Sequence, residues 1–150
     1  MRLSSAQKLL PWAPLAIRLS LGVIFLAHGA QQLFGIWDGP GVPARIEIAK
    51  ASSPIAAYLA FIAAGTELVG GIAVAVGLLT RLAALGLALD MIAWILRVPL
   101  INGFFLNWSM APGKGHGYEF SLALLAMSVA LFLSGPGKLA LDHVLGFEEN

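Results

Sequence analysis

The 150-residue sequence contains no cysteine. This absence excludes a disulfide bond, a thiolate nucleophile, a dithiol relay and an iron–sulfur cluster held by cysteine. If the protein handles electrons, a bound organic cofactor or a partner protein must therefore carry them.

Charged residues are scarce as well. Asp, Glu, Lys and Arg make up 11% of the chain, whereas hydrophobic residues make up 59% and the mean hydropathy is +0.85. A soluble domain is about one quarter charged, so this chain has too little polar surface to cover a water-soluble globule, and we expect a lipid bilayer around it. The net charge is only +1. Nucleic acid is excluded as a partner, because the basic residues are scattered singly instead of forming a basic face.

Four apolar segments are long enough to cross a membrane, because a spanning helix needs roughly 20 apolar residues. Pro11 and Pro14 suit the start of the first, and Ser52-Ser53-Pro54 is a typical start for the second. Only Thr80-Arg81 separates the second from the third, which predicts an antiparallel hairpin. We expect one all-α membrane domain, an antiparallel bundle of four transmembrane helices. The expected helices cover about residues 15–34, 55–79, 82–100 and 118–134.

The two longer connections are expected together on the opposite side of the bundle. Residues 43–51 suit a short interfacial helix, and residues 101–117 carry Phe104, Phe105 and Trp108, which are typical interface anchors. If both termini are cytoplasmic, four basic residues lie inside and three outside, which the positive-inside rule favours slightly. The inner set is Arg2, Lys8, Arg81 and Lys138, and the outer set is Arg45, Lys50 and Lys114.

Small residues form a row along the second expected helix. Ala63, Gly71 and Ala75 lie at helical spacing around Glu67. Such rows let helix backbones approach closely in lipid, where association depends on packing. The row predicts a helix–helix contact face that places Glu67 inside the bundle.

Ionisable side chains inside a membrane cost on the order of 2.5–3.5 kcal/mol each, so they are expected to face the bundle interior and to mark functional sites. At about 1.5 Å of rise per residue, several from different helices fall into adjacent layers in the half near the long loops. A second, smaller group lies near the other face and suggests an interfacial clamp. The first group is His28, Gln31, Glu67, Asp90, Arg97 and Glu119, and the clamp is Arg18, Arg81 and Asp142.

The first group predicts a polar pocket that opens toward the long loops. His28, Glu67 and Glu119 are the candidate catalytic residues, because a histidine beside a carboxylate can exchange protons near neutral pH. The alternative is that these groups only fix the packing of the helices. A metal site is not expected, because the chain lacks a His pair at ligand spacing, and haem is not expected either. The candidate ligand-binding residues are Gln31, Gln32, Asp90, Trp94 and Arg97.

Several motifs in order along the chain resemble the DoxX family of membrane proteins. The resemblance covers nearly the whole chain. The motifs are RLSLG at 18–22, HGAQQLFG at 28–35, ELVGG at 67–71, GLLTR at 77–81, GHGYE at 115–119 and GPGKLALD at 135–142.

The resemblance implies a four-helix membrane bundle, similar to the large subunit of thiosulfate:quinone oxidoreductase, in a bacterial or archaeal inner membrane. Two positions depart from the family pattern: Gln32 stands where Lys is usual, and Ala140 where Ser is common. The first departure removes a cation and disfavours an anionic substrate. By resemblance, the site residues are Arg18, His28, Gln31, Glu67, Arg81, Glu119 and Asp142.

The leading hypothesis is a membrane subunit of a redox complex, with a site for a quinone-type ligand. A redox partner subunit would supply electrons, and a homo-oligomer is a further expected assembly. One alternative is a non-catalytic membrane scaffold whose ionic network only specifies packing. The other is a small-solute carrier, which ranks last because carriers use a two-sided path with broken helices and these polar layers cluster toward one side.

Overall fold

The computed structural model describes residues 9–52, 54–97 and 99–148, and these residues form helices, turns and loops without a β-strand. The predicted all-helical class is thus confirmed for the described part of the chain. Arg2, Lys8 and Ser53, which entered the predictions of orientation and helix start, lie outside the described residues. The elements are η1 (Leu10–Trp12), α2 (Ala13–Phe34), α3 (Gly41–Ser52), α4 (Pro54–Val76), α5 (Thr80–Arg97), η2 (Pro99–Asn102), α6 (Glu119–Ser134) and α7 (Leu141–Val144).

The turn between α4 and α5 differs from the prediction. α4 ends at Val76 instead of 79, and Thr80-Arg81 forms the first turn of α5 instead of the link. The reason is backbone conformation: Gly77 has φ +72° and Leu79 has φ +47°, and a left-handed glycine just past the last helical residue ends a helix. At its other end α5 stops at Arg97, and a 3-10 helix begins at Pro99, which cannot donate an α-helical hydrogen bond.

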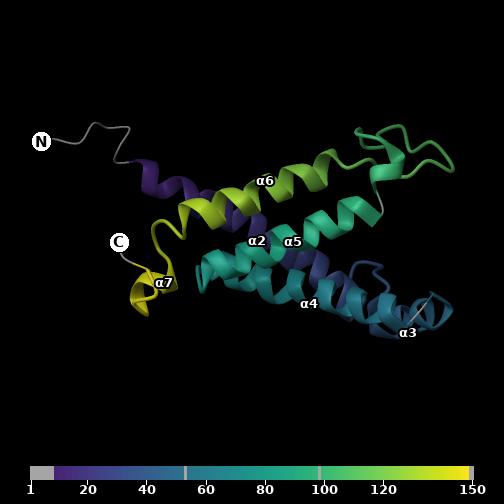
Figure 1. Ribbon diagram of the computed structural model, residues 1–150, viewed down its shortest axis with the longest axis horizontal. Helices are drawn as coiled ribbons and strands as arrows, with labels where there is room; N and C mark the ends of the chain where they lie inside the picture. The colour runs from purple at the N-terminus through teal and green to yellow at the C-terminus, as the bar shows by residue number, and fades with distance from the viewer. Residues whose placement is uncertain (1–8, 53, 98, 149–150) are drawn as a thin grey trace, which may run out of the picture.

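The four long helices, α2, α4, α5 and α6, run lengthwise along the molecule (Figure 1). α2 packs against α4 and α6, and α5 packs against the same two helices. The α4–α5 turn, η1 and α7 lie at one end of the molecule, whereas α3 and the loop between η2 and α6 lie at the other. We call the second of these the loop end. The antiparallel arrangement brings groups far apart in sequence to the same height.

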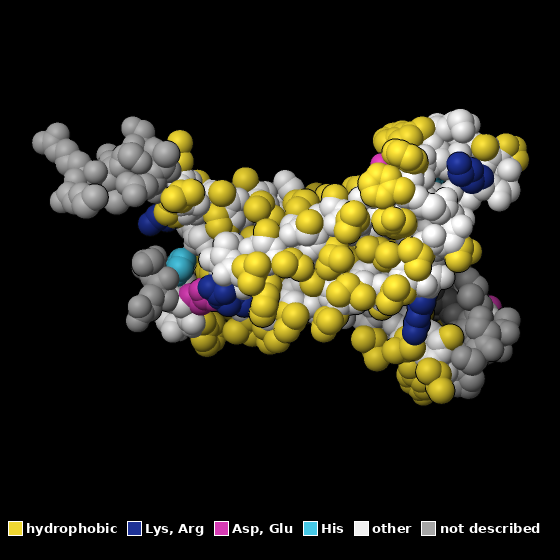
Figure 2. Space-filling view, turned by 45° about the horizontal axis from the view of Figure 1, so that its top comes forward, with side chains coloured by type: hydrophobic (Ala, Val, Ile, Leu, Met, Phe, Trp, Pro, Cys, Tyr) yellow, Lys and Arg dark blue, Asp and Glu magenta, His cyan; other side chains and the backbone are white. Residues whose placement is uncertain are grey.

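The outer surface of the helices is apolar. Val23 is 62% exposed, Val69 66% and Leu133 68%. On the face shown in Figure 2, hydrophobic side chains cover the middle of the molecule, and the visible charged side chains lie toward its two ends. Among the described residues, two helices, Leu10–Phe34 and Tyr58–Val76, are long and apolar enough to cross a membrane, and α6 is a shorter apolar helix. A continuous exposed apolar surface of this kind is stable only when lipid or protein covers it.

Glycines set the closest helix contact, which is between α2 and α4. A Cβ atom added at Gly22 would lie 2.7 Å from the Cβ of Ala75 and 2.8 Å from the carbonyl oxygen of Gly71. A Cβ atom at Gly71 would lie 2.6 Å from the backbone nitrogen of Leu26. The predicted contact face is therefore confirmed at Gly71 and Ala75. The buried core beside it contains Leu21, Phe25, Val74, Ala84, Leu87, Met91, Leu124 and Leu131.

Candidate functional site

A cavity of about 830 Å³ lies between α2, α4, α5 and α6, in the half of the molecule toward the loop end. The structure brings every predicted member of the polar pocket to this cavity except Glu119. Apolar side chains such as Leu59, Met91 and Leu124 complete its wall. Its polar and aromatic lining residues are His28, Gln31 and Gln32 from α2, Thr66 and Glu67 from α4, Asp90, Trp94 and Arg97 from α5, and Phe120 and Ser121 from α6.

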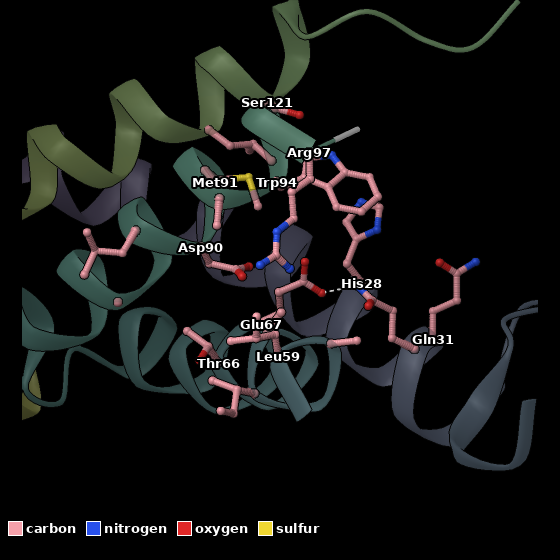
Figure 3. Close-up of a pocket in the computed structure, with 18 of the residues that line it drawn as sticks. His28, Gln31, Leu59, Thr66, Glu67, Asp90, Met91, Trp94, Arg97 and Ser121 are labelled. Atoms are coloured by element: carbon pink, nitrogen blue, oxygen red, sulfur yellow. Dashed lines mark hydrogen bonds between the residues drawn. The ribbon is translucent and has the colours of Figure 1, made fainter. Parts of the chain in front are cut away.

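Glu67 is the most deeply placed ionisable group of the cavity, with 8% of its surface exposed. Gln32 of α2 donates a hydrogen bond from Nε2 to Oε2 of Glu67, which links α2 to α4 across the cavity. In Figure 3 the Arg97 guanidinium points between the carboxylates of Asp90 and Glu67. Asp90 and Arg97 share a helix face because positions seven apart in an α-helix lie almost in line. Charged groups from α4 and α5 and one amide from α2 thus meet at one point.

The charge of this group decides which ligands suit the cavity. Glu67 and Asp90 are acidic, whereas Arg97 is basic. The two carboxyl groups outnumber the one guanidinium, so the cavity does not favour an anion. At position 32, where the family resemblance implies a cation, the neutral amide of Gln32 instead satisfies the Glu67 carboxylate. The arrangement suits a neutral ligand that exchanges protons with carboxylates.

Glu119 was predicted as a catalytic residue, and the structure places it elsewhere. It is the first residue of α6 and does not line the cavity. Its Oε1 accepts a hydrogen bond of 2.8 Å from the backbone N–H of Leu106, so its carboxylate holds the loop before α6. The estimate from axial rise gave the height of Glu119 but not the direction of its side chain around the helix.

Three other predicted residues line the cavity: Gln31, Trp94 and His28. Gln31 donates from Nε2 to the carbonyl oxygen of Trp37 at 3.1 Å, so its amide binds the chain after α2. In Figure 3 its side chain lies apart from Glu67. Trp94 is 50% exposed, and His28 is exposed too. These two side chains are therefore accessible from outside, unlike the buried Glu67.

The sequence reasoning missed Thr66 and Ser121, which line the cavity beside the charged groups. Ser121 follows Glu119 by two residues, and a helix turns by about 100° per residue, so Ser121 faces the cavity although Glu119 does not. An uncharged hydroxyl side chain costs little free energy inside a membrane helix, so the cost argument that singled out the charged residues did not single out these two. The one available clue was that Thr66 directly precedes Glu67.

The loop between η2 and α6 is organised by Asn107, which the sequence reasoning also missed. This side chain is 6% exposed, and its Nδ2 donates to the carbonyl oxygens of Ala111 and Lys114 at 3.1 and 2.7 Å. The backbone N–H of Asn107 donates to Nδ1 of His116 at 3.2 Å. His116 therefore has a structural contact within the loop and is not a residue of the cavity.

Arg18 lies in the half of the molecule away from the loop end, 1% exposed, and binds backbone carbonyls. Its Nε donates to Val74 at 3.0 Å and one Nη donates to Ala75 at 3.3 Å, both near the C-terminus of α4. The remaining bonds reach the segment after α6. Basic side chains stabilise the free carbonyls and the negative dipole end of a helix C-terminus. The other acceptors are the carbonyls of Pro136 at 2.8 Å, Lys138 at 3.3 Å and Leu139 at 3.0 Å.

The other two predicted clamp residues bind at the same end but not to each other. Asp142 is 1% exposed and accepts hydrogen bonds from the backbone N–H groups of Leu79 at 2.5 Å and Thr80 at 2.9 Å, which begin α5. Arg81 pairs with Glu148 at 2.5 Å and donates to carbonyls at the end of α6. The three residues thus tie the helix ends to the C-terminal segment.

The apolar helical surface and the polar cavity inside it define a helical membrane protein. The chain belongs to the DoxX family, whose sequence pattern matches residues 13–100. It is 35% identical over 139 residues to the uncharacterized membrane protein Rv3486 of Mycobacterium tuberculosis, covering 90% of this chain and 82% of that protein. It is 33% identical over 128 residues to "Putative oxidoreductase CatD" of Bacillus subtilis, covering 85% and 83%. No solved structure matches the chain.

Proposed function

We propose that this protein is a membrane subunit of a redox complex and that its cavity binds the head group of a quinone-type ligand. The observation that supports the proposal is the convergence of Glu67, Asp90 and Arg97 in a cavity of about 830 Å³ between apolar helices. Ligand sites are commonly cavities of this size with apolar walls and a few converging polar groups. The name of the Bacillus subtilis relative supports the redox assignment.

The proposal includes a membrane arrangement in which α2, α4, α5 and α6 all cross the bilayer. α5 has 18 residues and α6 has 16, which gives lengths of roughly 27 and 24 Å against a hydrocarbon core of about 30 Å. α5 also carries Asp90 and Arg97, which weaken its insertion as an isolated helix. Its contacts with α4 and α6 place it among the other helices. Both termini then lie on one side, which we assign to the cytoplasm of a bacterial or archaeal inner membrane.

A quinone, when bound, takes up two electrons and two protons to become a hydroquinone. The chain itself provides groups for the protons: Glu67 and Asp90 can each hold one, and His28 is accessible from outside. Gln32 donates a hydrogen bond to the Glu67 carboxylate, and Arg97 points toward it. The chain has no cysteine, so the electrons come from a redox partner subunit or directly from its substrate.

The test is quinone binding to the purified protein in lipid nanodiscs. We expect Glu67→Gln to lower the affinity about tenfold or more, because a buried ligand that loses a charge-assisted hydrogen bond loses about 1.5–3 kcal/mol. Glu119→Gln is the matched control, since it makes the same chemical change outside the cavity and keeps an oxygen that can accept from the Leu106 N–H. Equal affinity of wild type and a folded Glu67→Gln variant would contradict the proposal.

The second candidate is a scaffold whose ionic group only specifies packing. The direction of Arg97, between Asp90 and Glu67, favours it. Under this alternative, Glu67→Gln lowers the thermal unfolding midpoint and the wild-type protein binds no quinone. Thermal unfolding of the same two variants in detergent therefore separates the candidates.

A further inference from the structure

A second cavity, of about 620 Å³, follows the surface between α4 and α5 toward the turn that joins them. We call it the α4–α5 groove. Its lining is almost entirely apolar and contains no ionisable side chain. It includes Gly65, Val69 and Ala73 from α4, and Leu79, Leu82 and Gly86 from the α4–α5 turn and α5.

The groove adjoins the polar cavity. Ile62, Thr66 and Gly86 line both of them. From Gly86 to Leu79 the groove extends for roughly 10 Å at about 1.5 Å per residue. The polar cavity and the groove are therefore neighbours, with the charged groups in the first and an almost entirely apolar lining in the second.

Two glycines keep this groove open. A Cβ atom at Gly65 would meet no atom within 4 Å, and one at Gly86 would meet only Cγ2 of Thr66 at 3.6 Å. Gly71 is different, because a Cβ atom there would lie 2.6 Å from the backbone of α2. Close helix packing thus explains Gly71 but not Gly65 or Gly86. At these two positions the missing side chain leaves space on the surface.

We propose that the α4–α5 groove binds the apolar tail of the ligand whose head group lies in the polar cavity. This inference rests on the proposed function and narrows its ligand to a long-tailed amphiphile of the isoprenoid-quinone class. The head is neutral and hydrogen-bonding, which suits the polar groups of the cavity, and the tail leaves past Ile62, Thr66 and Gly86. Lipid tails are as apolar as the groove, so the groove contributes by shape and van der Waals contact.

The experiment compares two analogues of one quinone in nanodiscs, one with a single isoprene unit and one with several. Affinities are corrected for partition into protein-free nanodiscs. Gly65→Leu fills the groove without touching the polar cavity, because position 65 lines only the groove. Ala123→Leu is the matched control, since this exposed residue of α6 lines neither cavity.

We expect Gly65→Leu to weaken binding of the long-tailed analogue on the order of tenfold, which corresponds to about 1.4 kcal/mol, and to leave the short-tailed analogue unchanged. Leu82→Trp fills the same groove from α5 and serves as the second variant if Gly65→Leu fails to fold. An equal loss of affinity for both analogues overturns the inference. Unchanged affinity for both analogues also overturns it and assigns the groove to lipid acyl chains. If neither analogue binds the wild-type protein, the proposed function itself fails. If both analogues bind the wild type but Gly65→Leu does not discriminate between them, only the groove inference fails.

Discussion

Arg18 donates a hydrogen bond from Nε to the backbone carbonyl of Val74 at 3.0 Å, across 56 positions of sequence. The same guanidinium also binds carbonyls of the segment between α6 and α7. One buried side chain of α2 therefore satisfies backbone groups of two other segments. Such groups cost energy when they are buried without a partner, so the fold depends on this contact more than on an average packing contact.

We expect Arg18→Met to lower the free energy of unfolding by about 3 kcal/mol or more, because two buried and three partly buried hydrogen bonds lose their charged donor at once. Arg18→Lys should recover only part of the loss, since an ammonium group lacks the planar fork of donors. The measurement is the thermal unfolding midpoint in detergent by circular dichroism. Lys138→Met, an exposed cation nearby, is the control. Equal midpoints for Arg18→Met and Lys138→Met would contradict the role of the guanidinium.

Asp142 caps the start of α5 from the C-terminal segment. Its carboxylate accepts from the N–H groups of Leu79 and Thr80. Replacing a capping side chain with Ala lowers the free energy of unfolding by about 0.5–2 kcal/mol. We expect the loss in Asp142→Ala to lie at the upper end of this range, because Asp142 is buried. Asp142→Asn retains one acceptor and should cost less. Hydrogen exchange should show faster exchange at the Leu79 and Thr80 amides in Asp142→Ala.

For this capping experiment Asp38→Asn is a suitable control. Asp38 is exposed and has φ +59°, a conformation that Asn tolerates. The variant should therefore leave both the unfolding midpoint and the exchange of the two amides unchanged. Protection that persists at Leu79 and Thr80 in Asp142→Ala would show that another group caps α5.

The contact between α2 and α4 predicts opposite effects for two glycines of the same helix. Gly71→Ala places a methyl group against the backbone of Leu26, and overpacking of this kind costs about 1–3 kcal/mol. Gly65→Ala places the methyl group in open space, so the higher helix propensity of alanine should leave stability unchanged or raise it by up to about 1 kcal/mol. Thermal unfolding of both variants in one detergent tests the difference. A midpoint for Gly71→Ala at or above that of Gly65→Ala would contradict the tight crossing.

The absence of cysteine makes the proposed membrane orientation directly measurable. Lys114→Cys introduces a thiol in the exposed loop before α6, and Val144→Cys introduces one in α7, where the native side chain is 78% exposed. A membrane-impermeant thiol reagent added to intact spheroplasts should label the first variant at once and the second only after permeabilisation. The reverse pattern would place the termini outside, and labelling of both from one side would contradict the four-span arrangement.

Much of the site could be predicted from the sequence, because a charged residue in an apolar helix must face the bundle interior. This reasoning placed Glu67, Asp90 and Arg97 in the half of the bundle near the long loops, and the structure brings them to one cavity. It failed for Glu119. This residue was assigned to the same half of the bundle, but its side chain turns to the loop and binds the N–H of Leu106. Height follows from residue counting alone, whereas the facing of a helix depends on how its neighbours pack.

The sequence by itself determined that this chain is helical and apolar, and its ordered motifs indicated the DoxX family, because composition and residue order are local properties. Only the tertiary structure decided that Gln32 binds Glu67 and that Arg18 binds carbonyls at the end of α4. It also decided that Gly65 borders open space, whereas Gly71 packs against the backbone of α2. All of these contacts depend on the distances between neighbouring helices. Helix packing fixes them, and two glycines six positions apart in one helix acquire opposite roles only when a neighbour approaches one of them.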